Sequence, residues 1–401
     1  MNNRATGFES ISVKDTEQNE NVRSHSLPIY ASSAFEFESL EHGISIFTGE
    51  TNGYVYGRYG NPTLDAVANK IALLEGYGTG VEPVAFLTPS GMSAIYLAVN
   101  ASVSPGQTLL AQYNLYGGTT ELLQKVVSGQ GREVVFTDLR DAERLRRDLS
   151  TNNKVAAIYL ETPSNPDLRC VDILQVTEIA GEFGVKTILD NTFATPYLQR
   201  GFGLDVDIVI HSTTKYLNGN GNIIGGVILG KDAEFMNSRV KDQLKLMGAM
   251  ASPFDSWILN NGMKTLALRM ERHCDNAEKI ATVLDAHEKV SKVNYPGLTD
   301  HPDHKVAAKQ MARFGGMLSF ELAGGLEAGK KFMAGIEFCS LAPTLGNVDT
   351  LILHPASMSH LKVPKEIREK IGITDGLVRL SVGIETAEDI IKDLVGALDR
   401  I

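Results

Sequence analysis

One segment of the chain reads Asp207-Ile208-Val209-Ile210-His211-Ser212-Thr213-Thr214-Lys215. It begins as a continuous apolar run, which is typical of a strand covered on both faces, and it ends in hydroxyl groups and an amine. A similar run at 187–189 lies upstream and ends in Asp190. Because the carboxyl ends of parallel strands meet at one edge of a sheet, we expect Lys215 and Asp190 to lie close together.

Short apolar runs of this kind recur between residues 85 and 230 and alternate with longer amphipathic segments. Seven of them occupy residues 85–87, 108–111, 134–136, 157–160, 187–189, 208–210 and 227–229. Runs that are apolar throughout indicate strands buried between two layers of helices. The sequence therefore predicts an α/β fold with a mainly parallel seven-stranded sheet between helices, and ligands bound at the carboxyl ends of its strands.

The length of 401 residues indicates more than one core, and the pattern divides the chain into three parts. Residues 1–62 mix short apolar pieces with Gly and Asn and are expected to form an irregular arm. Residues 63–254 contain the predicted sheet and open with a helix that Thr63 would cap. Residues 255–401 predict a smaller α+β domain. Its expected elements are a long helix at 257–287 interrupted near Gly262, strands at 317–322 and 377–382, and a closing helix at 387–399.

Composition excludes several classes of function. The formal net charge of −10 argues against a nucleic-acid-binding protein, and no apolar run approaches the ~20 residues of a membrane helix. Three cysteines that are far apart predict neither disulfides nor a zinc site, and no metal site is expected from His301 and His304 either. Because the first residues are polar and lack an apolar signal segment, we expect a cytoplasmic protein.

The combination of lysine, carboxylate and hydroxyl groups has a specific chemical use. A lysine holds the aldehyde of pyridoxal 5'-phosphate (PLP) as a Schiff base, a carboxylate pairs with the pyridinium nitrogen, and hydroxyl groups bind phosphate oxygens. The turn Thr88-Pro89-Ser90-Gly91-Met92 follows another predicted strand and opens a helix. Most such turns merely start helices, but here the backbone N–H groups of the turn are also suited to bind the phosphate.

Four further residues follow predicted strands or lie within one. Tyr116 is either a surface tyrosine or a ring that stacks on the pyridine, and Asn165 is either part of a rigid turn or a partner for the cofactor's 3-hydroxyl. Arg379 is either exposed on an amphipathic strand or clamps a substrate carboxylate. His211 is expected to be a packed, hydrogen-bonded structural residue.

Taken together, these residues resemble the Cys/Met-metabolism PLP-dependent enzymes, the cystathionine γ-synthase-like group of fold type I. The motifs that carry the resemblance span nearly the whole chain. They are residues 56–63, 90–92, 116–118, 161–166, 190–192, 211–216, 295–298, 314–320 and 378–381.

The resemblance implies a role for each residue around the cofactor. Lys215 would form the Schiff base, Asp190 would pair with the ring nitrogen, and Tyr116 would stack on the ring and act in catalysis. Asn165 would contact both cofactor and substrate. The phosphate would be bound by backbone and hydroxyl groups of Gly91, Met92, Ser212 and Thr214.

The same resemblance implies an oligomer. Tyr56 and Arg58 would reach the phosphate bound in a neighbouring subunit, which implies an obligate dimer and usually a homotetramer. The partner molecule otherwise expected is a small amino-acid substrate, whose carboxylate Arg379 would bind beside Thr344.

The implied reaction is γ-elimination or γ-replacement. Members that act on cystathionine usually have Glu where this chain has Pro343, and many have Ser at Thr344. Methionine γ-lyases commonly have Cys at the position of Gly118. We expect a methionine γ-lyase-like reaction that gives 2-oxobutanoate, ammonia and a thiol. The alternatives are γ-replacement on O-acylhomoserine (O-acetylhomoserine sulfhydrylase or cystathionine γ-synthase type), a cystathionine γ-lyase, and a catalytically silent binding protein, against which the intact Lys215 and its partners argue.

Overall fold

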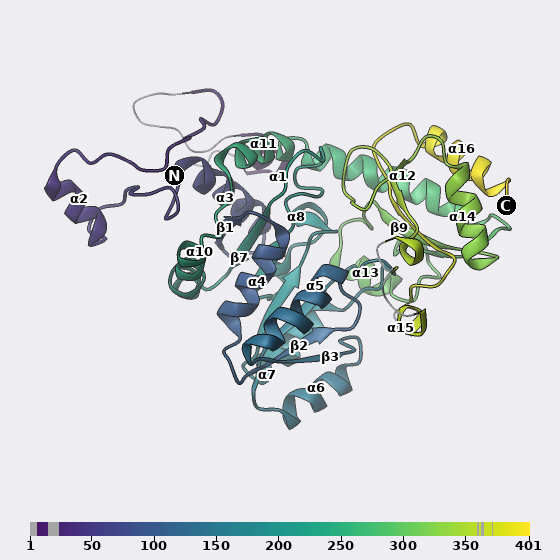
Figure 1. Ribbon diagram of the computed structural model, residues 1–401, viewed down its shortest axis with the longest axis horizontal. Coiled ribbons are helices and arrows are strands. Elements are labelled where there is room, and N and C mark those ends of the chain that lie inside the picture. The colour runs from purple at the N-terminus through teal and green to yellow at the C-terminus, as the bar shows by residue number, and fades with distance from the viewer. Residues whose placement is uncertain (1–5, 15–23, 359–360, 362–364, 371) are drawn as a thin grey trace.

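The computed structural model describes residues 6–14, 24–358, 361, 365–370 and 372–401 (Figure 1). Parts of the predicted arm, residues 1–5 and 15–23, lie outside the described residues. Within the described ranges, no helix combines the length and the apolar character needed to cross a bilayer.

The larger sheet has seven strands in the order β1-β7-β6-β5-β4-β2-β3. Strands β3, β2, β4, β5 and β6 run parallel, and β7 is antiparallel to both of its neighbours. The prediction of a mainly parallel seven-stranded sheet is confirmed, and each predicted run lies in one strand. The strands are β1 (Val84–Thr88), β2 (Thr108–Gln112), β3 (Glu133–Thr137), β4 (Val155–Glu161), β5 (Lys186–Asp190), β6 (Ile208–His211) and β7 (Gly226–Gly230).

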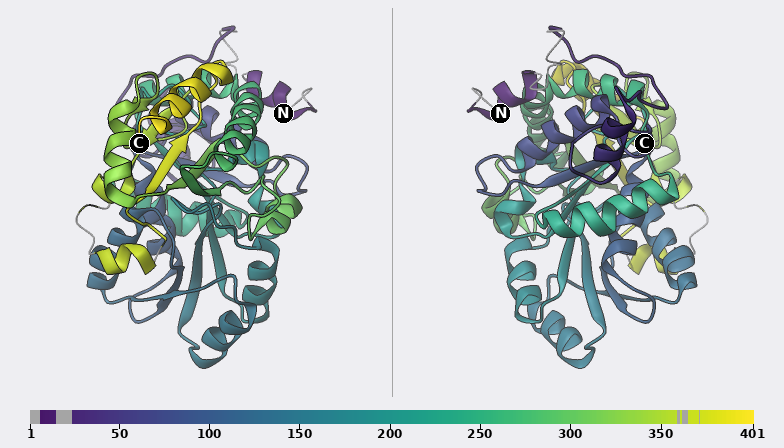
Figure 2. Two further views of the ribbon diagram at one scale, coloured as in Figure 1. Left: turned by 90° about the vertical axis from the view of Figure 1, so that its right-hand side faces the viewer. Right: turned by 90° about the vertical axis from the view of Figure 1, so that its left-hand side faces the viewer.

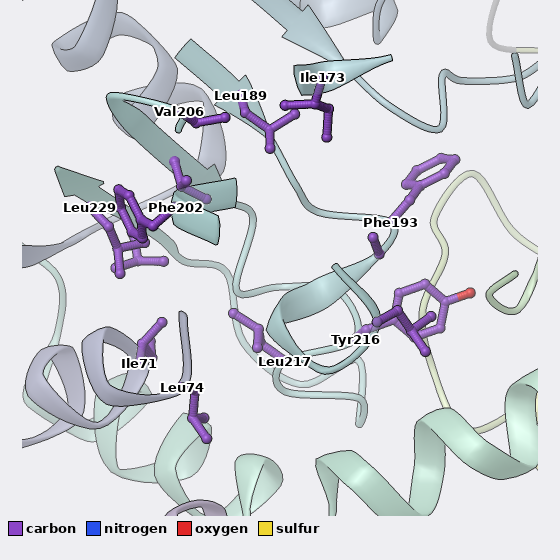
Figure 3. Packing of buried hydrophobic residues seen from close by; sticks show 14 of the residues in the cluster. Ile71, Leu74, Ile173, Leu189, Phe193, Phe202, Val206, Tyr216, Leu217 and Leu229 are labelled. Carbon is purple, nitrogen blue, oxygen red and sulfur yellow. The ribbon is translucent and has the colours of Figure 1, made fainter. Parts of the chain in front are cut away.

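Helices cover both faces of this sheet, as the views in Figure 2 show. Successive strand residues point to opposite faces, so that Ile188 packs in the core under α4 and Leu189 packs in the core under α3 and α7. Figure 3 shows part of the core that contains Leu189. This core also includes Ile71 and Leu74 of α3. The covering helices are α3 (Pro62–Glu75), α4 (Gly91–Ser102), α5 (Gly117–Glu121), α6 (Ala142–Thr151), α7 (Ile173–Glu182), α8 (Thr195–Leu198), α9 (Ala233–Phe235), α10 (Lys241–Met247) and α11 (Pro253–Met263).

The start of α3 corrects one prediction. Asn61, not Thr63, caps the helix, because the Asn61 side chain accepts a hydrogen bond from the backbone N–H of Thr63 at 2.9 Å. Pro62 occupies the first helical position, where its missing N–H is not needed. The Thr63 hydroxyl instead donates to the carbonyl of Pro28 and accepts from the N–H of Tyr30, which ties the arm to the helix.

The second sheet lies at the carboxyl-terminal end of the chain, with strands in the order β10-β11-β12-β9-β8. The predicted long helix is interrupted near Gly262 as expected, because α11 ends at Met263 and the next helix begins at Leu266. The elements of this region are α12 (Leu266–Asp285), β8 (Val290–Asn294), α13 (His304–Gln310), β9 (Met317–Leu322), α14 (Gly325–Gly335), β10 (Ser340–Leu341), β11 (Leu351–Leu353), α15 (Lys365–Lys370), β12 (Leu377–Ser381) and α16 (Ala387–Leu398). The boundaries at 62/63 and 254/255 stay a prediction.

The arm is less irregular than expected, because it contains α1 (Phe8–Val13) and α2 (Leu40–Phe47). Phe8 of α1 packs edge-on against the rings of Tyr77 and Tyr197. In contrast, α2 projects from the body of the chain (Figure 1), and its Leu40 and Phe47 side chains are 75% and 69% exposed. The arm therefore presents apolar surface that the chain itself does not cover.

Candidate active site

Three polar residues end neighbouring strands of the large sheet: Glu161 on β4, Asp190 on β5 and His211 on β6. Glu161 and Asp190 are register partners, so their side chains start from adjacent positions at the same edge. The segment after β6 turns back through Ser212 and places Lys215 at this edge. The structure therefore brings together the ends of β5 and β6, from which Asp190 and Lys215 were predicted to approach each other.

Lys215 is held by a loop from the other sheet. Its Nζ donates a hydrogen bond to Thr344 Oγ1 at 2.7 Å. Burial, together with the positive charge of Arg379, lowers the pKa of Lys215 to about 8. The loop can approach because Gly346 has a φ of +78°, and an added Cβ would lie 2.7 Å from the backbone nitrogen of Tyr216.

Arg379 is buried, at 7% exposure, so the alternative of an arginine on an exposed strand face is wrong. Its Nη1 donates to Asn165 Oδ1 at 3.1 Å, and its Nη2 donates to the carbonyl of Thr344 at 2.9 Å. Among the described residues, Nε of Arg379 has no hydrogen-bond partner. A buried guanidinium group with a free N–H is a suitable site for a carboxylate.

Asp190 lies in a network of donors. Its Oδ1 accepts from the backbone N–H and hydroxyl of Thr192 at 3.1 and 2.5 Å, and its Oδ2 accepts from the Tyr159 hydroxyl at 3.3 Å. Burial raises the pKa of Asp190, and the hydrogen bonds from Thr192 oppose that shift. A cation placed against this carboxylate would favour the ionised form.

His211 lies behind Asp190 and is fully buried, as expected of a structural histidine. Its Nε2 is 2.6 Å from Oε1 of Glu75, a residue at the end of α3. The same oxygen accepts from Asn191 Nδ2 at 2.9 Å. Sequence reasoning missed Glu75, because nothing in the local pattern of α3 distinguishes it from a surface glutamate.

Two of the predicted phosphate-binding residues, Gly91 and Met92, begin α4, and the other two, Ser212 and Thr214, follow β6. The Ser90 side chain caps this helix by accepting from the N–H of Ser93 at 3.1 Å. A Cβ on Gly91 would lie 2.8 Å from Cβ of Ser212, so only glycine allows the two segments to approach this closely. The Thr214 hydroxyl bonds to the backbone of Gly225 in both directions. The phosphate-binding roles of these residues stay predictions.

Tyr116 is 49% exposed and lies immediately before α5. A Cβ on Gly118 would lie 2.6 Å from Cε1 of the Tyr116 ring and 3.3 Å from Sδ of Met92. The ring of Tyr116 therefore lies close to Gly118, and Met92 of α4 borders the same space. The stacking of the Tyr116 ring on the cofactor stays a prediction.

Tyr56 and Arg58 lie elsewhere on the chain. The Arg58 guanidinium donates to the carbonyl of Lys245 on α10 and lies 4.8 Å from the centre of the Tyr59 ring. Within the described residues of one chain, no hydrogen bond or ion pair joins Tyr56 or Arg58 to the residues around Lys215. The role of Tyr56 and Arg58 in binding the phosphate of a neighbouring subunit stays a prediction.

Comparisons with known proteins identify the family. The family model described as Cys/Met metabolism PLP-dependent enzyme matches residues 9–399. An L-methionine γ-lyase of Fusobacterium nucleatum subsp. nucleatum is 45% identical over 376 residues, 94% of this chain and 93% of that protein. A cystathionine β-lyase of Lactococcus lactis subsp. cremoris is 44% identical over 375 residues, 94% of each.

Solved structures give the same result. Cystathionine γ-synthase from Xanthomonas oryzae pv. oryzae, in complex with cystathionine, superimposes with a TM-score of 0.90 at 38% identity over 98% of both chains. The family model covers nearly the whole chain, and these relatives match it over more than nine-tenths of its length. The protein therefore belongs to the Cys/Met-metabolism family of PLP-dependent enzymes.

Proposed function

We propose that the protein is a carbon–sulfur lyase that acts on methionine or a closely similar amino acid and releases 2-oxobutanoate, ammonia and a thiol. The observation that carries the proposal is the bonded series Lys215–Thr344–Arg379–Asn165, which puts a proton-transfer group beside a carboxylate-binding group. The relatives at 42–45% identity that bear the name L-methionine γ-lyase support it.

The residues present fit PLP, the cofactor of the family. Asp190 supplies a buried carboxylate, Lys215 supplies a buried amine of lowered pKa, and Gly91 leaves the start of α4 open to a close approach. When bound, PLP supplies an aldehyde for Lys215 and a ring that stabilises negative charge at the substrate carbons. Asp190 would hold the pyridine nitrogen in its charged form.

Arg379 binds the substrate carboxylate and sets the orientation of the amino acid. Two of its N–H groups donate to Asn165 and Thr344, and its buried Nε has no hydrogen-bond partner among the described residues. When its amine is not bound to PLP, Lys215 would take up the proton from Cα, pass that proton on to the bound cofactor and, neutral again, take up the proton from Cβ. A pKa of about 8 leaves part of the amine neutral near neutral pH, which this step requires.

Tyr116 assists the departure of the thiol by donating a proton to the sulfur, since its side chain is half exposed. Pro343, next to Thr344, offers no charge to a distal amino group. A substrate with an uncharged tail, such as methionine, therefore loses nothing here, whereas cystathionine would lack a partner for its second ammonium group.

We also propose a cytoplasmic homotetramer built from dimers that share active sites. In each dimer, Tyr56 and Arg58 of one subunit would bind the phosphate of the cofactor that is attached to Lys215 of the other subunit. The exposed apolar side chains of α2 on the arm support an interface there. The cysteines Cys170, Cys274 and Cys339 are all buried and free, which agrees with a reducing compartment.

The proposal is tested by offering the PLP-loaded enzyme four substrates separately: methionine, cystathionine, homocysteine, and O-acetylhomoserine with sulfide. We expect 2-oxobutanoate and a thiol from methionine, at a higher kcat/KM than from cystathionine. Homocysteine formed only in the last mixture would assign the protein to γ-replacement instead. The Lys215→Ala variant serves as the control and should release no 2-oxobutanoate.

A further inference from the structure

One buried carboxyl group touches two predicted site residues without belonging to the proposed reaction. Glu161 ends β4 and is 4% exposed. Its Oε2 accepts a hydrogen bond from the backbone N–H of Tyr116 at 2.9 Å, and its Oε1 accepts from the backbone N–H of Asn165 at 3.1 Å. Each oxygen therefore holds the backbone of a different residue.

The two residues lie in separate loops. Tyr116 follows β2, whereas Asn165 lies in the turn that follows β4, the neighbour of β2 in the sheet. The side chain of Asn165 in turn accepts from Arg379 on the other sheet. Glu161 thus connects the loop that carries Tyr116 to the turn that carries Asn165. The side-chain amide of Asn165 in turn contacts Arg379.

Ionising the carboxyl group of Glu161 at this position costs free energy. Burial raises the pKa of Glu161, and the charge of its register partner Asp190 raises it further, while the two backbone N–H groups lower it. Buried carboxyl groups that face each other destabilise a fold unless they are compensated, so stability alone gives little reason for this arrangement. Two backbone donors aimed at separate oxygens give a geometric reason.

We propose that Glu161 is a positioning residue that fixes the backbone of Tyr116 and Asn165 together, so that the ring and the amide keep their places in the PLP site. The identity of that site rests on the proposed function. The coupling itself rests only on the two hydrogen bonds. Glu161 touches neither substrate nor cofactor in this assignment, and it acts through the two residues that do.

The sharpest variant is Glu161→Gln, which keeps the size of the side chain. An amide offers one acceptor oxygen and turns an NH2 group toward the other N–H donor, so one of the two bonds must fail. We expect hydrogen–deuterium exchange in the holoenzyme to become roughly tenfold faster in the segment 113–118 or in 161–169. Unchanged exchange in both segments would overturn the proposal.

Asp393 offers a matched control. Its two oxygens also accept two backbone N–H groups, those of Glu337 and Cys339 at 2.8 and 2.9 Å, but in the small sheet's helical layer. Asp393→Asn should speed exchange around 337–339 and leave the absorbance band of bound PLP and both kinetic constants unchanged. Glu161→Gln should shift that band and lower kcat by roughly tenfold or more, because the ring and the amide move relative to the cofactor.

Equal effects of both variants on the band would show that Glu161 has only a structural role. If Glu161→Gln does not fold, Glu161→Asp keeps the charge and withdraws both oxygens by one methylene group, and it should accelerate exchange in both segments. These exchange measurements do not depend on the substrate. A failure to cleave methionine would therefore sink the proposed function and leave the Glu161 assignment intact, whereas unchanged exchange would do the reverse.

Discussion

Lys215 and Thr344 are 129 positions apart in the chain, yet Nζ of the lysine donates to Oγ1 of the threonine at 2.7 Å. The lysine follows β6 of the large sheet, and the threonine lies in the loop between β10 and β11 of the small sheet. The carbonyl of the same threonine accepts from Arg379. One residue thus sets the distance between the group that moves protons and the group that binds the substrate carboxylate.

Replacing Thr344 tests this contact. Thr344→Val keeps the shape of the side chain and removes the hydroxyl, so the lysine amine loses its partner. A hydrogen bond to a charged group contributes about 1.5–3 kcal/mol, which predicts a kcat/KM lower by roughly ten- to a hundredfold. Steady-state kinetics checks this, with Thr344→Ser as the control that retains the hydroxyl. An unchanged kcat/KM in Thr344→Val would show that the hydrogen bond does not contribute to the reaction.

Cofactor loading should depend on pH through Lys215. Burial lowers its pKa to about 8, and only the neutral amine reacts with an aldehyde. The neutral fraction therefore rises roughly tenfold per pH unit below pH 8 and levels off above it. Stopped-flow absorbance of PLP-free protein mixed with PLP measures this rate. Arg379→Leu removes a positive charge, so its midpoint should move to higher pH; a wild-type rate that still rises tenfold between pH 9 and 10 would contradict the prediction.

A side chain at Gly118 is expected to displace the Tyr116 ring from the position that it has in this chain. In Gly118→Ala the new Cβ would lie 2.6 Å from the Tyr116 ring, and relieving such overpacking costs about 1–3 kcal/mol. The ring should move, which weakens PLP binding. Gly129→Ala is the control, because no heavy atom lies within 4 Å of its added Cβ. Equilibrium dialysis of PLP against both variants measures the difference, and equal affinities would refute the assignment of the ring to this space.

Arg269 should stabilise the turn that carries Lys215. It is buried on α12, and its guanidinium donates to the carbonyls of Tyr216, Leu217 and Gly262 at 2.7, 3.2 and 2.9 Å. Arg269→Met removes the donor to the buried carbonyls of Tyr216 and Leu217, and we expect the free energy of unfolding to fall by ~3 kcal/mol. Denaturant titration of the holoenzyme measures this. Arg146→Leu removes an exposed ion pair with Glu182 and should be indistinguishable from wild type.

Subunit mixing tests whether the active site is shared. Arg58→Ala and Lys215→Ala should each be inactive alone. If Arg58 completes the site of the neighbouring subunit, a mixed dimer contains one intact site and one doubly altered site, and random mixing restores about a quarter of wild-type activity. The measurement is 2-oxobutanoate release after the two variants are unfolded and refolded together. No recovery would place Arg58 and Lys215 in the same subunit's site.

Much of the large sheet was predictable from local pattern. Apolar runs such as 208–210 reveal buried strands because burial on both faces leaves no position for a polar side chain. Helix ends were less predictable, because both Asn61 and Thr63 are good capping residues. Asn61 is selected by its tertiary contact, in which its side-chain amide donates to the carbonyl of Tyr30. The helix α2 was missed because its apolar side chains face away from the chain's own core.

By itself, the sequence determined which residues follow the strands, and with them the chemistry of Lys215 and Asp190, because strand ends and residue types are local properties. It left open whether Arg379 is exposed, and it gave Glu161 no role. Those answers came only from the tertiary structure, in which Arg379 meets Asn165 across 214 positions and Glu161 meets Tyr116 across 45. The contact of Arg379 depends on how the two sheets pack, and that of Glu161 depends on the order of strands within the large sheet. No short window of sequence contains both partners of either contact.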